Sequence, residues 1–218
     1  MASVCTVSFG VCLVRVTRVD DNGNVIAGEN GYVTDSVQSI SVSPNLETGN
    51  DFSVRNGCGC GIASRKFPDT FKFWDLTIQL AKKEPILESF LLGANQITDG
   101  SDVVGLAFPS ALACDEANPA VALEFWTEAI TGSGLDATYP YFHWVFPSTV
   151  WQLGDTTFEE GPGAASFSGF SQTNGNWGDG PYGDGPPDGE DISEGGYWAT
   201  ADALPTAECA AQAVSAVS

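Results

Sequence analysis

Residues 4–19, with the sequence VCTVSFGVCLVRVTRV, decide the fold class of this chain. Apolar residues alternate there with Ser, Thr and Arg, and this two-residue period is typical of a β-strand. The alternation, and the lack of a basic segment before it, argue against a signal peptide. The sequence DDNGN at 20–24 then predicts a turn that makes a hairpin with the following segment.

The same period recurs along the chain and predicts a mainly β protein. The further expected strands are 32–42, 52–64, 70–80, 121–130, 141–153 and 165–172. Turn-forming residues predict a loop at 43–51. A short helix is expected at about 85–93, because Pro85 suits a first helical position and Gly93 suits an end. The expected fold is an antiparallel β-sandwich or barrel with this one flanking helix and long loops.

The chain is expected to form a single β domain over 1–203, followed by an Ala-rich tail at 204–218. The domain includes a Gly-, Asp- and Pro-rich loop at 173–196 that cannot pack a core by itself. The tail is expected to be a short helix or a frayed end. No run of eighteen apolar residues occurs, so a membrane span is not expected.

Charge is distributed unevenly along the chain. The formal net charge is −20, and all 8 Lys and Arg residues lie at or before Lys83. Eight acids accompany them there, so the remaining twenty acids face no base in the rest of the sequence. Nucleic-acid binding needs basic residues that displace counterions from phosphates, and this pattern opposes it. The charge favours a surface that repels DNA.

The residues that could act in catalysis or metal binding are explained more simply by structural roles. Cys58-Gly59-Cys60 is interpreted as a glycine-rich strand or bulge, with a disulfide or a metal role as the alternative; a closed zinc site needs about four ligands, and His143 is the single histidine. The six cysteines are interpreted as mostly reduced, because their spread over the chain does not resemble a small disulfide-stapled scaffold. His143 lies among aromatic residues without a nucleophile motif, so we expect it to be packed in a strand. The pairs Glu124/Glu128 and Glu159/Glu160 are expected by chance in so acidic a chain. We therefore expect no enzyme activity and no cofactor.

The acidic loop is a second candidate metal site. Asp179, Asp184, Asp188, Glu190 and Asp191 offer hard oxygen ligands for Ca²⁺ on a flexible backbone. Their spacing matches neither the EF-hand loop nor the nonapeptide calcium repeat. A solvated loop is the favoured interpretation, with Asp179, Asp184, Asp188 and Asp191 as weak candidate ligands.

The order of several segments resembles the major tail tube protein of long-tailed (siphovirus-type) bacteriophages, especially those of actinobacterial phages. The similar segments are Tyr32–Ser36, Ile40–Val42, Gly49–Asp51, Asn56–Gly59, Phe71–Ile78, Glu84–Glu88, His143–Pro147, Phe167–Phe170 and Asn174–Tyr182. Together they cover most of residues 5–182. The resemblance implies a β-sandwich with a flanking helix that assembles into hexameric rings, which stack into a tube in the virion tail.

The resemblance also implies partners and contact residues. The chain is expected to assemble with itself in the host cytoplasm and to meet tape measure, tail terminator and tail tip or baseplate proteins, while DNA passes through an acidic lumen without tight binding. The candidate ring-stacking residues are Asn45, Glu47, Asn50 and Asp51. The candidate inter-subunit bases, which would meet acids of a neighbouring copy, are Arg15, Arg18, Arg65 and Lys66.

Two other function classes stay open. One is a secreted or surface β-sandwich that binds carbohydrate through Trp177, Tyr182 or Trp198, with calcium in the acidic loop. The other is an acidic enzyme with an unrecognised motif, which the lack of any nucleophile–base constellation disfavours. Polymerisation, glycan binding and turnover would distinguish the three.

Overall fold

The computed structural model describes residues 6–108, 118–132, 134–154, 165–178, 180–183, 195–208 and 210–215. Over these residues the protein is mainly β, with one helix, as the sequence predicts. The elements are β1 (Val7–Arg18), β2 (Gly28–Thr34), β3 (Val37–Glu47), β4 (Asp51–Arg55), β5 (Gly61–Lys66), β6 (Thr70–Leu80), α1 (Pro85–Leu92), β7 (Asn95–Asp99), β8 (Asp102–Ala107), β9 (Ala120–Thr131), β10 (Gly134–Leu135), β11 (Tyr141–Leu153), β12 (Ala165–Ser171), β13 (Tyr197–Ala201) and β14 (Gln212–Val214). In this described part, no helix is long and apolar enough to span a membrane.

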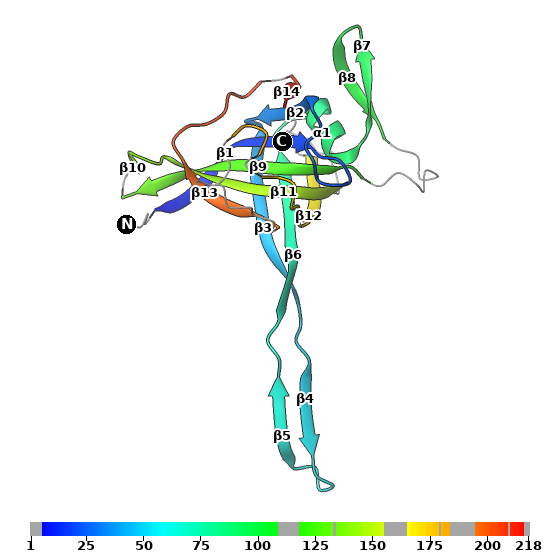
Figure 1. Cartoon of the computed structure of the whole chain (residues 1–218), viewed down its shortest axis with the longest axis vertical. Coiled ribbons are helices and arrows are strands. Elements are labelled where there is room, and N and C mark those ends of the chain that lie inside the picture. The colour runs from blue at the N-terminus through cyan, green and yellow to red at the C-terminus, as the bar shows by residue number, and fades with distance from the viewer. Residues whose placement is uncertain are drawn as a thin grey trace, which may run out of the picture.

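One large antiparallel sheet forms the body of the molecule. Its strands follow the order β14-β2-β1-β9-β11-β12-β6-β3, with β10 beside β9 and β13 beside β11. The long strand β11 pairs with β9 on one side, and with β13 and then β12 on the other. In Figure 1, β3 and β6 cross β1, β9 and β11, an arrangement consistent with the predicted β-sandwich.

Two hairpins project from the body (Figure 1). The longer one, which we call the arm, continues the β3–β6 pair through β4 and β5 and extends far from the sheet. The shorter one is β7–β8, which turns at Gly100 in the left-handed conformation, with φ 65°. None of the strands expected from the sequence falls on these residues, so this hairpin was not anticipated.

The first strand and its turn are confirmed. Strand β1 spans Val7–Arg18, with a register shift between Phe9 and Leu13. The side chain of Asp20 closes the turn, because its Oδ1 accepts hydrogen bonds from the backbone N–H groups of Asn22 at 2.9 Å and Asn24 at 2.8 Å. Hydrogen bonds from Asn24 lower the pKa of Asp20.

Several expected boundaries are wrong for local reasons. The strand expected at 32–42 is two strands, because a turn in which Ser36 N–H donates to Thr34 Oγ1 at 3.0 Å separates β2 from β3. The loop expected at 43–51 is strand as far as Glu47. Pro44 is tolerated there because β3 is at the edge of the sheet, where a missing N–H removes no bond to a neighbour.

The expected strand 52–64 and the expected tail also differ from the structure. Residues 52–64 belong to β4, a turn and β5. In the tail, Gln212–Val214 form β14, which pairs with β2 and so joins the sheet. Ala-rich composition suggested a helix or a frayed end, but pairing with the open edge of β2 determines the conformation.

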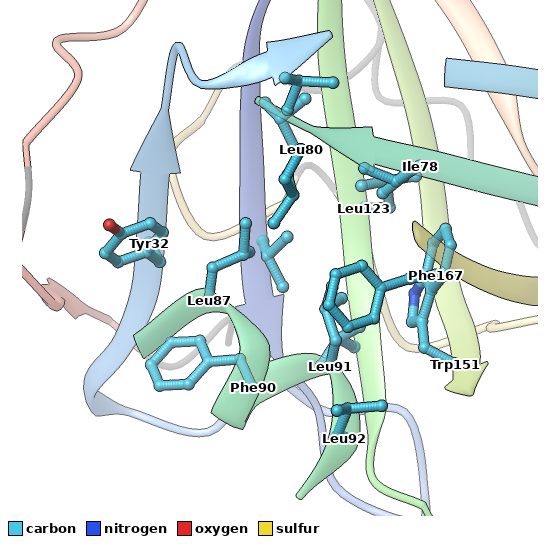
Figure 2. Packing of buried hydrophobic residues seen from close by; sticks show 14 of the residues in the cluster. Tyr32, Ile78, Leu80, Leu87, Phe90, Leu91, Leu92, Leu123, Trp151 and Phe167 are labelled. Carbon is cyan, nitrogen blue, oxygen red and sulfur yellow. The ribbon is translucent and has the colours of Figure 1, made fainter. Parts of the chain in front are cut away.

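Helix α1 covers one side of the core (Figure 2). It begins at Pro85 and ends before Gly93, whose φ of 65° is left-handed, as predicted for a helix end. Leu87, Phe90 and Leu91 point from it toward the sheet. The core that they complete includes Tyr32, Ile78, Leu80, Leu123, Trp151 and Phe167, all buried. This packing gives the body its own well-filled interior.

Candidate functional site

The arm is the most distinctive surface of the chain. Strands β4 and β5 pair only with each other, in the register Phe52↔Arg65 and Val54↔Ala63. Every residue of both strands is exposed. A two-stranded hairpin that is not supported by other elements has marginal stability in water. The arm is therefore the part of the described chain that depends least on contacts within the molecule.

One face of the arm is apolar. Since side chains alternate along a strand, Phe52, Val54 and Phe67 share a face, and the rings of Phe52 and Phe67 meet edge to face with centroids 6.0 Å apart. The exposed fractions are 58% for Phe52, 57% for Val54 and 39% for Phe67. Large aromatic side chains held in water on a projecting element indicate an interaction surface.

The arm also carries positive charge. Residues 51–66 contain three bases, Arg55, Arg65 and Lys66, against one acid, Asp51. The Arg65 guanidinium lies 4.6 Å from the centroid of the Phe67 ring. Within the described residues, none of the three bases is within 4.0 Å of a carboxylate. Arg65 and Lys66, predicted as inter-subunit bases, are thus accessible on the arm.

The tip of the arm is a tight turn, so the strand or bulge predicted for Cys58-Gly59-Cys60 is wrong. Asn56 Oδ1 accepts hydrogen bonds from the backbone N–H groups of Cys58 at 3.1 Å and Cys60 at 2.8 Å. Gly59 has a φ of 83°, which favours glycine. Cys12, Cys58 and Cys60 are free in the structure, and the other three cysteines lie outside the described residues.

The four predicted ring-stacking residues lie together where the arm leaves the body. Asn45 Nδ2 donates to Asp75 Oδ2 at 2.9 Å, and Glu47 Oε2 is 3.5 Å from Lys72 Nζ. The carbonyl of Asn50 accepts the N–H of Phe67 at 3.0 Å, and Asp51 begins β4. Three of them lie in β3 or β4, and only Asn50 lies in the short connection between these strands, so most of the predicted loop is paired strand.

Arg15 was predicted as an inter-subunit base, and this prediction is wrong. The residue is only 3% exposed and forms two hydrogen bonds with Glu124, Nε to Oε2 and Nη2 to Oε1, each 2.6 Å long. His143 Nε2 is 3.1 Å from Glu124 Oε1, and the His143 ring stacks on Trp126 at 4.2 Å. Tyr182 covers the guanidinium, with its ring centroid 3.7 Å away. Arg15 therefore cannot reach a neighbouring subunit.

The buried network keeps Glu124 ionised. Burial by itself raises the pKa of a carboxyl, but the positive charge of Arg15 and the hydrogen bonds from His143 and Arg15 lower the pKa of Glu124 to about 2. The network joins β1, β9 and β11 through side chains far apart in the sequence. His143 is therefore a packed strand residue, as predicted, and both carboxylate oxygens of Glu124 are bonded to Arg15 or His143.

The remaining candidate residues form no site in the described part of the chain. The weak metal candidates Asp179, Asp184, Asp188 and Asp191, and also Glu190, Glu159 and Glu160, lie outside the described residues. Among the residues that are described, no group of three or more His, Cys, Asp or Glu side chains could hold a metal ion. Of the candidate carbohydrate-binding aromatics, Trp177 is buried at 2% exposure, Tyr182 covers Arg15, and Trp198 is 55% exposed.

The apolar face of the arm was not predicted from the sequence. Phe52, Val54 and Phe67 were assigned to a strand or a connection, without a partner surface. The available signal was the alternation of Phe52 and Val54 just before the turn-forming Asn56-Gly57, with apolar residues returning after it. No family model matches this chain, and no curated protein is similar to it.

Proposed function

We propose that this chain is a structural protein that assembles with copies of itself into stacked rings, forming the tail tube of a long-tailed bacteriophage. The observation that carries the proposal is the arm, an exposed β-hairpin with an apolar face and unpaired bases. A hairpin of this kind gains stability when its aromatic side chains are covered. The exposed apolar face of the arm therefore favours contact with a partner surface.

A second copy of the chain supplies a partner of suitable charge. The arm has a formal charge of +2 over residues 51–66, whereas the sequence after Lys83 contains twenty acids and no base. Opposite charges guide the encounter of two surfaces and fix their register. A contact between an arm and a different surface of the next copy is heterologous, and repetition of such a contact produces a ring or an open filament.

The body offers a second surface for assembly. A hollow of about 400 Å³ lies between the first half of β1 and the start of β3, with Phe125, Trp144, Ile40 and Val42 among its lining residues. β3 is at the edge of the sheet, and β1 pairs with β2 only from Val14 to Thr17. Open strand edges beside an apolar hollow favour pairing with another copy, and ring closure removes such edges.

The charge supports the conduction of DNA through the assembled tube. A lumen with an excess of Asp and Glu repels phosphates and leaves the DNA free to move. In this proposal the tube also contacts tape measure, tail terminator and tail tip or baseplate proteins. DNA is transported and not bound, in agreement with the scarcity of bases in the chain.

Negative-stain electron microscopy of the concentrated protein at moderate salt tests the proposal. We expect hollow tubes or rings from the unaltered chain, and none from Phe52→Ser/Phe67→Ser. The matched control is Ile97→Ser/Val104→Ser, because these residues are 49% and 59% exposed on the other projecting hairpin. Tubes from the arm variant would contradict the role of the arm.

Carbohydrate binding is the alternative. The exposed indole of Trp198, whose ring centroid is 5.9 Å from that of Trp144, favours it as a stacking platform for a sugar. Burial of Trp177 disfavours it. A protein that stays monomeric at high concentration and binds a glycan array through Trp198 would replace the assembly proposal.

A further inference from the structure

Arg18 differs from every other base in the chain. Four bases have a carboxylate within 4.0 Å: Arg15 with Glu124, Lys72 with Glu47, Lys82 with Glu84 and Lys83 with Glu88. Three more are exposed on the arm, where water solvates them. Arg18 alone is half-buried and has no carboxylate partner in the described part of the chain.

The surroundings of Arg18 remove part of its water without placing a carboxylate within 4.0 Å in the described part of the chain. Its guanidinium lies 4.9 Å from the centroid of the Phe90 ring, on helix α1. Burial lowers the pKa of Arg18, which shows that the protein disfavours its charge there. A cation in this position is stabilised when an anion binds, because part of its desolvation has already occurred.

The side chain of Arg18 lines a polar hollow of about 370 Å³ at the end of β1. The last turn of α1 and the start of β7 form its walls, and Ala211 closes it from the segment before β14. Asn95 and Gln96 bring side-chain amides, and Gln96 Nε2 donates to Ser89 Oγ at 2.8 Å. Glu29 is the one acid in the lining; it is exposed and more than 4.0 Å from the guanidinium.

We propose that this hollow binds a carboxylate, which Arg18 holds through its paired N–H groups with help from the amides of Asn95 and Gln96. A guanidinium presents two parallel donors that match the two oxygens of a carboxylate. Resting on the proposed function, we assign the carboxylate to an Asp or Glu side chain of a second copy. The sequence after Lys83 contains twenty acids and no base, and among the described ones only Glu84, Glu88 and Glu124 lie within 4.0 Å of a Lys or Arg.

Acetate tests the hollow independently of assembly. Unassembled full-length protein is titrated with acetate against chloride at equal ionic strength, and NMR signals of the Arg18 Nε–H and the Gln96 amide are followed. We expect saturable shifts that Arg18→Gln abolishes and that Glu29→Gln retains. Thermal unfolding checks that the variants fold. Absence of saturable shifts in the unaltered protein would overturn the site.

The critical concentration for assembly, measured by sedimentation, identifies the source of the carboxylate. We expect Arg18→Gln to raise it about tenfold or more, Arg18→Lys to raise it less, and Glu29→Gln to leave it unchanged or lower it. Acetate binding with unchanged assembly of Arg18→Gln would refute the second-copy assignment and indicate a free carboxylate ligand. If the unaltered chain never assembles while acetate binds, the proposed function fails and the site stands.

Discussion

Arg15 in the body and Arg65 on the arm are the same residue type in opposite surroundings. Arg15 is 3% exposed and donates two hydrogen bonds of 2.6 Å to Glu124, whereas Arg65 is exposed and lies over the ring of Phe67. The same contrast holds for aromatic residues, because Trp126 is buried against His143 while Phe52 is 58% exposed. The body pairs the buried Arg15 and Glu124 with each other, and the arm leaves basic and apolar side chains available to a partner.

Removal of the arm tests this contrast most directly. Residues 51–66 can be replaced by Asn-Gly, because Phe67 N–H already bonds to the carbonyl of Asn50 at 3.0 Å, as in a closed hairpin. We expect assembly to be abolished and the thermal unfolding midpoint to change by only a few degrees, since β4 and β5 bury nothing in the core. Sedimentation and calorimetry measure the two effects. A large loss of stability would mean that the arm supports the body.

Charge reversal on the arm should have the next largest effect. Arg65→Glu/Lys66→Glu changes the formal charge of residues 51–66 from +2 to −2. We expect this variant to fold normally but not to extend tubes, because like charges on two surfaces disfavour their contact. Electron microscopy and a salt series check the result. Arg65→Gln/Lys66→Gln, which removes charge without reversing it, should assemble partly, and more so at high salt. Tubes of normal length from the reversed variant would refute the charge-guided contact.

The two regions were also unequally predictable from sequence. In the body, Pro85 and Gly93 marked the helix, and alternation located most strands, because these signals are local. The burial of Arg15 depends on Glu124, 109 residues further along the chain, and on Tyr182. Alternation could not reveal it, since residues 13–17 of β1 are buried on both faces.

On the arm, local signals were misleading. Pro44, Gly49 and Asn50 are typical of a loop, but the β3–β6 pair extends past Pro44 because an edge strand tolerates it. Because of these turn-forming residues, the sequence did not reveal that the β4–β5 hairpin continues the β3–β6 pair. Arg65 and Lys66 were found because the distribution of charge is visible in sequence without knowledge of the fold.

Among the variants in this section, Glu124→Gln should have the smallest effect on assembly and the largest effect on the stability of the body. The substitution leaves the Arg15 guanidinium buried without a counter-charge, and we expect a loss of about 3 to 5 kcal/mol in the free energy of unfolding, measured in urea. Its control is Lys72→Gln, which breaks the exposed pair with Glu47, at 3.5 Å, and should cost less than about 0.5 kcal/mol. Equal losses in the two variants would show that the buried pair has no special role.

The pH dependence of stability sharpens the same prediction. The pKa of Glu124 is about 2 in the folded chain, against an ordinary value of 4.5. Because the folded value is lower, ionised Glu124 contributes fully to stability above about pH 4.5, and this contribution is lost as the pH falls toward 2. The two values correspond to about 3 kcal/mol. Urea unfolding between pH 7 and pH 2 should show this loss in the unaltered protein and a correspondingly shallower one in Glu124→Gln. Parallel curves for the two proteins would mean that other carboxylates, and not the buried network, govern the acid stability of the body.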